Sequence, residues 1–157
     1  MRPAHLALAA GFVALPANAI AGTVTVVLPR VPIAEYKKPY VAAWIEPAGG
    51  GGARSLFAWY KTSGAEGTKW LADLRSWWRK SGRTMKLPAD GVSGATRGPG
   101  SYTIPLPADL KPGKYVLNVE AAREHGGREL VSVPISVPAA GGKAAGKTEL
   151  GTVTVTK

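Results

Sequence analysis

The sequence predicts a mostly β protein, an immunoglobulin-like antiparallel β-sandwich with one inserted α-helix. About seven short apolar or alternating runs are typical of strands, and turns rich in glycine and proline separate them. One segment between these runs changes to a helical period. The chain has no cysteine, so the fold would lack the disulfide of antibody domains and packing alone would stabilise it.

The first 21 residues have the pattern of a secretory signal peptide. Arg2 precedes an apolar core from Leu6 to Leu15, and small residues over 17–21 offer two cleavage sites. A membrane anchor is the weaker interpretation, because the apolar run is short and Pro16 interrupts its end. We therefore expect a mature protein that is periplasmic or secreted, beginning at Ile20 or Gly22.

Residues 22–157 are enough for a single domain with a core of its own. The formal net charge of +10 raises the possibility of binding to polyanions or a membrane surface. Nucleic acid is not an expected partner, because the basic residues are scattered and the leader would remove the protein from the nucleoid.

The strand predictions follow from period-two patterns and from short apolar runs. They cover Thr23–Leu28, Tyr40–Ile45, Arg54–Tyr60, Ser101–Leu106, Lys114–Ala122, Leu130–Val137 and Gly151–Val155. The run 40–45 is apolar on both faces, which suits a central strand, and the glycines at 49–52 suit a hairpin connection. The last predicted strand repeats the sequence Gly-Thr-Val-Thr-Val of residues 22–26, and we interpret both copies as half-exposed edge strands. Residues 139–148 are predicted to be a low-complexity linker.

A helix is predicted from about Thr68 to Lys80. Its apolar stripe consists of Trp70, Leu71, Leu74, Trp77 and Trp78. Such a stripe usually packs against a sheet, and this is the expected role of the first three residues. Trp77 and Trp78 stand closest in sequence to the motif described next, so they are candidates either for the core or for contact with a ligand.

The stretch Asp90-Gly-Val-Ser-Gly-Ala-Thr96 follows the predicted helix and is followed by Arg97-Gly-Pro-Gly100. Thr96 carries a hydroxyl, which is a poor nucleophile until a base activates it. Gly94 and Ala95 are small enough to let the backbone of another protein approach closely. The alternative is an ordinary surface turn, since Asp, Gly and Ser all favour turns.

These seven residues resemble the flavin-attachment motif of the FMN-carrying subunits of the sodium-pumping NADH:quinone oxidoreductase. In that family a magnesium-dependent FMN transferase moves FMN from FAD onto the last residue of the motif. The resemblance implies covalent FMN on Thr96 through a threonyl phosphodiester, with Asp90, Ser93, Gly94 and Ala95 recognised by the transferase. Arg97 would neutralise the phosphodiester, and Arg75, Arg79, Arg83 and Lys86 would favour the reduced flavin.

Over residues 23–137 the chain is similar to a family of periplasmic proteins known as a domain of unknown function, DUF2271. The matching segments include Pro39-Tyr-Val-Ala-Ala-Trp-Ile-Glu46, Trp77-Trp-Arg-Lys-Ser-Gly82 and Val119-Glu-Ala-Ala-Arg-Glu-His-Gly-Gly-Arg-Glu129. This resemblance implies extracytoplasmic electron transfer, with a membrane-bound reductase or another periplasmic redox protein as partner.

The leading hypothesis is therefore a periplasmic electron carrier with covalent FMN, its ring held by aromatic side chains such as Trp77 and Trp78. The alternative is an immunoglobulin-like binding or adaptor module without a cofactor. A self-contained enzyme is disfavoured because His125 is the one histidine of the mature chain. A zinc site is disfavoured as well, because one histidine and scattered carboxylates offer too few ligands. His125 could form a polar cluster near the flavin with Arg123, Glu124 and Arg128.

Overall fold

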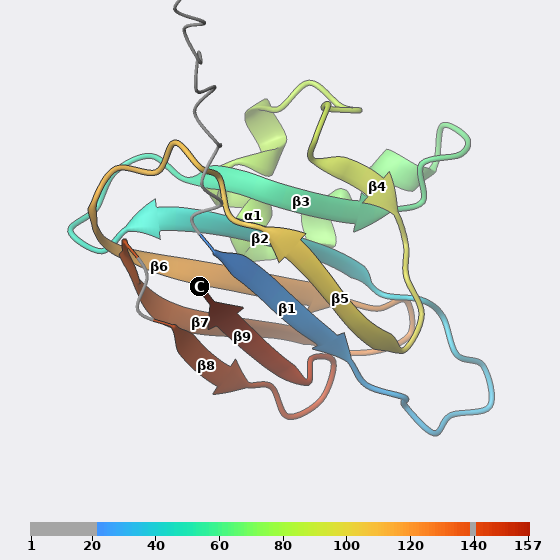
Figure 1. Ribbon diagram of the computed structural model, residues 1–157. Helices are drawn as coiled ribbons and strands as arrows, with labels where there is room; N and C mark the ends of the chain where they lie inside the picture. Colours follow the sequence, from blue (N-terminus) through green and yellow to red (C-terminus); the bar gives the residue numbers. More distant parts are fainter. Residues whose placement is uncertain (1–21, 139–140) are drawn as a thin grey trace, which may run out of the picture.

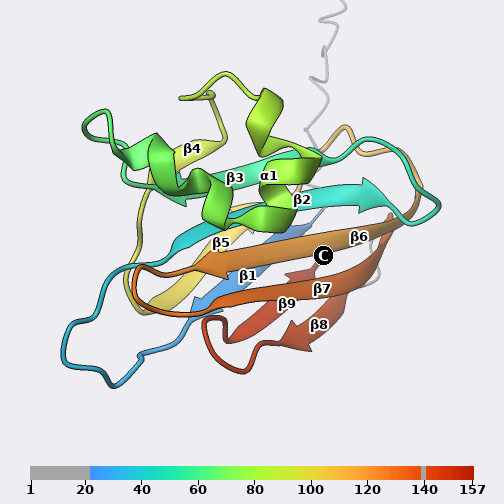
Figure 2. The same cartoon turned by 180° about the vertical axis from the view of Figure 1, so that it is seen from behind.

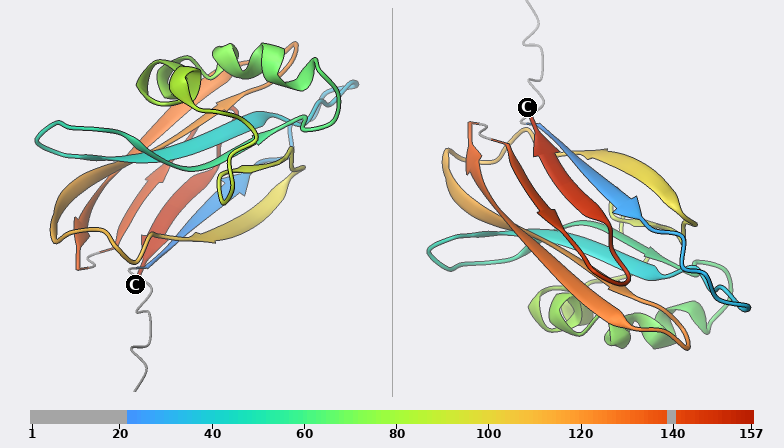
Figure 3. Two further views of the ribbon diagram at one scale, coloured as in Figure 1. Left: turned by 90° about the horizontal axis from the view of Figure 1, so that it is seen from above. Right: turned by 90° about the horizontal axis from the view of Figure 1, so that it is seen from below.

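The computed structural model describes residues 22–138 and 141–157, so the expected leader lies outside the described residues. The mostly β prediction is confirmed: two sheets pack face to face, and helical segments cover the outer face of the larger one (Figures 1 and 3). The larger sheet has the order β4-β3-β2-β6-β7 and the smaller one β5-β1-β9-β8. Their strands are β1 (Thr23–Leu28), β2 (Tyr40–Pro47), β3 (Arg54–Tyr60), β4 (Ser93–Ala95), β5 (Gly100–Pro105), β6 (Gly113–Ala122), β7 (Arg128–Val137), β8 (Gly142–Ala145) and β9 (Thr152–Thr156).

Neighbouring strands are antiparallel, with the exception of β3 and β4, which run parallel. This corrects the expectation of a purely antiparallel sandwich. Parallel neighbours need a long crossover connection, and here residues 61–92 supply it across the outer face of the larger sheet, as Figure 2 shows. The predicted central position of the strand at 40–45 is confirmed, because β2 lies between β3 and β6.

The two terminal copies of Gly-Thr-Val-Thr-Val are not edge strands, which corrects our interpretation of them. β1 lies between β5 and β9, and β9 lies between β1 and β8. The two copies pair with each other, Thr23 opposite Thr156 and Val24 opposite Val155. The alternation therefore reflects two faces, valines in the core and threonines in contact across the outer surface.

The predicted linker at 139–148 contains strand β8, which corrects that prediction over residues 142–145. Residues 139–140 lie outside the described residues. Composition did not indicate this strand, because it has no bulky apolar side chain: β8 pairs through its backbone with β9, and only the small Ala144 packs against the core.

The space between the sheets is filled by alternating residues of both. On β6 Leu117, Val119 and Ala121 are buried, and on β7 Val131, Val133 and Ile135 face the same interior. A second apolar cluster lies on the outer face of the larger sheet, where it packs against the helical segments.

The one inserted α-helix is confirmed, but it is shorter than the predicted span of 68–80. A 3₁₀-helix η1 (Gly67–Asp73) precedes the α-helix α1 (Arg75–Lys80), and a second 3₁₀-helix η2 (Gly82–Thr84) follows it. Leu74, between the first two, has φ −76° and ψ 71°, which no helix tolerates. A 3₁₀-helix has three residues per turn, so side chains at spacing three share a face. Leu71, Leu74 and Trp77 follow that spacing and are fully buried, whereas Trp70 turns outward and is 53% exposed. This corrects the core position expected for Trp70.

A buried carboxylate fixes the start of α1. The backbone N–H groups of Ser76 and Trp77 donate to the two carboxylate oxygens of Glu120 at 3.1 and 2.8 Å, and Arg128 pairs with the same carboxylate. Glu120 is 0% exposed, but its side chain lies on the opposite face of β6 from Val119 and Ala121, which belong to the core between the sheets. It faces the second cluster and satisfies the free N–H groups of a helix whose own residues supply no cap.

Among the described residues, no helix combines the length and apolar character needed to cross a bilayer. The same part of the chain holds no group of three or more His, Asp or Glu side chains arranged to bind a metal ion.

Candidate functional site

An open groove of about 810 Å³ lies at the end of the larger sheet where β3, β4 and β6 end and β2 begins. Thr96 is one of the residues that line it. The others are Tyr36, Lys37, Lys38, Tyr40, Lys61, Glu66, Trp70, Asp73, Ala122, Arg123, Glu124 and His125. We call this the Thr96 groove. Binding sites on loops held by a rigid sheet are common, because loops vary without disturbing the scaffold.

Four separate segments build the groove. The β1–β2 connection contributes Tyr36 to Lys38, η1 and the loop before it contribute Lys61 to Asp73, and the β6–β7 turn contributes Arg123 to His125. The fourth segment is the motif. Ala95 pairs with Tyr60 at the end of the parallel β3–β4 ladder, and Thr96 follows directly as a half-buried residue.

Inside the motif, Ser93 and Gly94 hold the local structure. The backbone N–H of Ala89 and the hydroxyl of Tyr60 both donate to Oγ of Ser93, at 2.9 and 3.1 Å. A Cβ added at Gly94 would lie 3.1 Å from the Trp59 indole, so a larger residue would push β4 away from β3. Asp90 and Ala95 are exposed. The motif therefore divides into two residues that shape it and two that face solvent.

Arg97 stacks on two aromatic rings beside the motif. Its guanidinium carbon is 4.2 Å from the centre of the Trp59 ring and 5.0 Å from that of Tyr102. Stacking on two aromatic rings holds the cation in place. Arg97 does not line the groove, and the structure brings it to Thr96 by sequence adjacency alone.

The structure does not bring Trp77 and Trp78 to the groove. Trp77 is 0% exposed, and its indole N–H donates to Oγ of Ser55 at 2.9 Å, at the start of β3. Trp78 packs half-buried against the same outer cluster. Since Thr96 follows the residue paired with the end of β3, Trp77 lies toward the opposite end of that strand, and neither tryptophan lines the groove. The cations Arg75, Arg79, Arg83 and Lys86 are exposed and also lie outside the groove lining.

Three of the four residues of the expected polar cluster do line the groove: Arg123, Glu124 and His125. His125 has a φ of 54° in the β6–β7 turn, is 83% exposed, and lies 3.6 Å from a carboxylate oxygen of Glu124. The fourth, Arg128, instead bonds to Glu120 beneath α1.

Arg123 is the most constrained cation of the groove. Nε and Nη2 donate to the carboxylate of Glu149 at 2.9 and 3.0 Å, and its side chain is only 6% exposed. Hydrogen bonding to Glu149 raises the pKa of Arg123 above its ordinary value. The third nitrogen, Nη1, is buried and has no hydrogen-bond partner within residues 22–138 and 141–157. This ion pair makes a rigid wall that carries one unused donor.

Tyr40 of the groove is likewise fixed. Tyr40 donates its hydroxyl proton to the carbonyl of Gly67 at 2.8 Å and packs edge-on against Tyr60, with ring centres 6.4 Å apart. Burial raises the pKa of Tyr36 and of Tyr40 above the ordinary tyrosine value, so both stay protonated near neutral pH.

The groove carries charges of both signs. Arg123 is paired with Glu149, and the lining also holds three lysines, Lys37, Lys38 and Lys61, and three carboxylates, Glu66, Asp73 and Glu124. The groove thus combines aromatic surface, charges of both signs and one threonine hydroxyl. Its volume is in the range of known small-molecule and cofactor sites, about 300–1,000 Å³.

Most of this lining was missed at the level of sequence. Apart from the expected cluster at 123–125, a further local signal is Tyr36-Lys-Lys-Pro-Tyr40, in which two tyrosines flank two lysines and a proline. Nothing in the sequence places Lys61 or Trp70 beside Thr96, because they meet it only through the sheet register and the break at Leu74.

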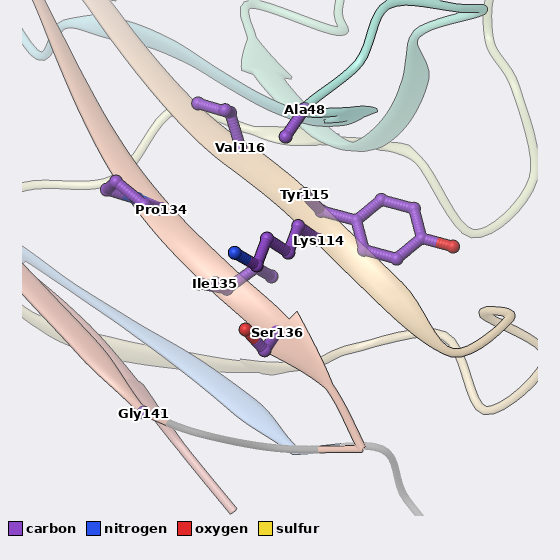
Figure 4. Close-up of a pocket in the computed structure, with 8 residues that line it drawn as sticks. All are labelled: Ala48, Lys114, Tyr115, Val116, Pro134, Ile135, Ser136 and Gly141. Carbon is purple, nitrogen blue, oxygen red and sulfur yellow. The ribbon is translucent and has the colours of Figure 1, made fainter.

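A second, smaller hollow of about 320 Å³ lies at the other end of the larger sheet (Figure 4). Tyr115 and Pro134 are among its lining residues, and Tyr115 pairs with Pro47, seven positions from the Tyr40–Ala122 pair of the groove. It contains one charged side chain, Lys114, and no group that the sequence analysis singled out. We therefore place the candidate site at the Thr96 groove.

No curated protein and no solved structure matches the chain. Residues 21–152 match the model of the family described as "Predicted periplasmic protein (DUF2271)", which confirms the expected location and shows that the protein belongs to this periplasmic family.

Proposed function

We propose that the protein is a periplasmic electron carrier that holds FMN covalently on Thr96 through a threonyl phosphodiester. One observation carries the proposal: the last residue of the attachment-like motif lines a groove of about 810 Å³ with aromatic walls. A simple surface turn would not need a groove beside its threonine. A tethered cofactor does, because its ring must be oriented and partly shielded from water.

The residues present fit such a group. Tyr36, Tyr40 and Trp70 offer aromatic surface, while Lys37, Lys38 and Lys61 offer donors to polar ring edges and to a phosphate. Bound FMN would supply the redox chemistry, and the protein would supply attachment, orientation and local charge.

Attachment would use a second protein, an FMN transferase, because a threonine hydroxyl is a poor nucleophile until a base activates it. β4 is the edge strand of its sheet, and Asp90 and Ala95 are exposed beside it. An FMN transferase can therefore reach the motif without unfolding the core. The further partner of the loaded protein is a membrane-bound reductase or another periplasmic redox protein.

The test is Thr96→Ala, made in cells that also express a flavin transferase. Wild type should be yellow and heavier by one FMN, whereas the variant should be colourless and should fold with stability within about 0.5 kcal/mol, as for other surface changes. Thr96→Ser should retain some label because the hydroxyl survives. Asp90→Ala should reduce labelling without abolishing it. Intact-mass spectrometry measures all four proteins, and Thr84→Ala, an exposed threonine on η2, serves as the matched control.

If Thr96→Ala still carries covalent FMN, or wild type never acquires it beside a competent transferase, the carrier proposal fails. The second candidate is then an immunoglobulin-like binding or adaptor module without a cofactor. The observation that favours it is structural: Ser93 and Gly94 have roles in holding β4 that account for their presence without any modification. Two facing sheets of mostly antiparallel strands support the immunoglobulin-like part of that proposal.

A further inference from the structure

Trp70 is an exposed tryptophan held in one place. Exposed large apolar residues among the described residues are Ile33, Trp70 and Leu130, and of these Trp70 alone lines the Thr96 groove. Its side chain is 53% exposed, which leaves apolar surface in water that a buried position would remove. The fold does not use this ring as core, because Leu71 and Leu74 fill that role from the same segment.

The segment that carries Trp70 is anchored on both sides of the residue. The Tyr40 hydroxyl binds the carbonyl of Gly67, and Leu71 is 0% exposed in the outer cluster. A Cβ at Gly67 would lie 1.6 Å from the carbonyl oxygen of Lys61, so this turn sits directly on the end of β3. Trp70 therefore projects from a fixed backbone and not from a free loop.

The surroundings of the ring suit a flat ligand. The ammonium of Lys69 lies 5.3 Å from the centre of the Trp70 ring, where a cation and an aromatic face attract each other. Tyr40, braced edge-on by Tyr60, gives the groove a second aromatic surface. Lys37, Lys38 and Lys61 belong to the same lining, and their ammonium groups suit a ligand whose edges accept hydrogen bonds.

We propose that Trp70 is the stacking platform for the isoalloxazine ring of the flavin attached at Thr96. This inference rests on the proposed function and assigns the ring contact to a residue other than Trp77 or Trp78. The ligand class is a planar fused aromatic system with polar edges. The tether fixes the phosphate end at Thr96, and the exposed tryptophan then sets where the ring lies.

The experiment separates ring binding from attachment by using lumiflavin, which has the ring and no phosphate chain. Thr96→Ala protein is titrated with lumiflavin, and ring fluorescence is followed as it is quenched by stacking. Adding Trp70→Leu should weaken lumiflavin binding roughly tenfold, the effect of losing one aromatic stacking contact together with its buried area. Trp78→Leu, on α1 and outside the groove lining, is the matched control and should leave the affinity unchanged.

A second readout uses the tethered cofactor. With Thr96 intact and FMN attached, Trp70→Leu should brighten flavin fluorescence, while Trp78→Leu should not. Circular dichroism should show both variants folded, since Trp70 is mostly exposed and Trp78 is only half-buried.

The two proposals fail in different ways. Absence of the FMN mass on wild type beside a competent transferase overturns the proposed function, and the lumiflavin titration then decides the stacking role by itself. A loaded Trp70→Leu protein with unchanged fluorescence and unchanged lumiflavin affinity overturns the stacking role alone. A response to Trp78→Leu in place of Trp70→Leu also overturns it.

Discussion

At the scale of single residues, the five tryptophans of this chain have three different environments. Trp44, Trp59 and Trp77 are buried, Trp78 is half-buried, and Trp70 is mostly in water. Trp70 and Trp77 are seven positions apart and would share a face in a regular α-helix. The 3₁₀ geometry of η1 and the break at Leu74 separate them, one into the groove and one into the core.

Trp77→Leu should destabilise the protein by about 2–4 kcal/mol, because it removes a fully buried ring and leaves the hydroxyl of Ser55 without its indole donor. Urea unfolding followed by circular dichroism measures the loss. Trp70→Leu is the comparison and should change the free energy of unfolding by less than about 1 kcal/mol. Equal destabilisation by the two variants would contradict the burial pattern.

At the scale of elements, α1 depends on a side chain from a distant strand. It has six residues, too few to be stable alone, and its first free N–H groups are satisfied by Glu120 of β6. The Lys80 ammonium also pairs with Glu46 of β2 at 3.0 Å, which ties the other end of the helix to the same sheet.

Glu120→Gln should cost about 1–3 kcal/mol, because an amide cannot accept all the bonds of the carboxylate and leaves buried partners unsatisfied. Amide exchange at Ser76 and Trp77, followed by NMR, should accelerate more than exchange on β1 or β9. Glu35→Gln, at an exposed position in the β1–β2 connection, should leave both quantities unchanged. Uniform acceleration throughout the protein would show instead that Glu120 acts on global stability and not on α1.

The connection between β8 and β9 is held by one carboxylate in a similar way. The backbone N–H groups of residues 147–150 all donate to Glu129 of β7. Burial acts to raise the pKa of Glu129, but these four hydrogen bonds outweigh it, and the pKa lies below its ordinary value.

Because this pKa is lowered, Glu129 makes the free energy of unfolding depend on pH in a defined direction. The unfolded carboxyl titrates near pH 4.3, so the stabilisation is complete above that pH and is lost as the pH falls through the lower folded value. Glu129→Gln should therefore weaken the protein at pH 7 and flatten the fall in stability below about pH 4. Urea unfolding between pH 3 and 7 tests this, and an unchanged acid slope would contradict the role of Glu129.

At the scale of the whole molecule, the sequence predicted the strands far better than the order in which they assemble. The alternation in 23–28 and 130–137 marked the buried faces correctly, because a period of two reports which side of a strand meets the core. The partner of each strand depends on contacts between residues far apart in the chain, so the pairing of β1 with β9 and the parallel β4 were not predictable.

The candidate site shows the same division. Thr96 was found because its neighbours form a local motif, whereas Trp70 and Lys61 join it only when the sheet register is set. The sequence also did not indicate that Glu120 and Glu149 are buried. A buried carboxylate is identified by the hydrogen-bond partners that the fold brings to it, and residue type alone does not show them.

The antiparallel pairing of β1 with β9 places the start of β1 and the end of β9 at the same end of the molecule. Thr23 and Thr156 lie side by side, and β1 runs from there to Leu28. The connection that follows β1 in Figure 1 contributes Tyr36, Lys37 and Lys38 to the groove. A tag placed after Lys157 and bound to an electrode surface would therefore hold every copy by the end that is away from Thr96. Immobilised in this way, the protein would present the groove to solution in a uniform orientation, with its strands running between surface and electrolyte.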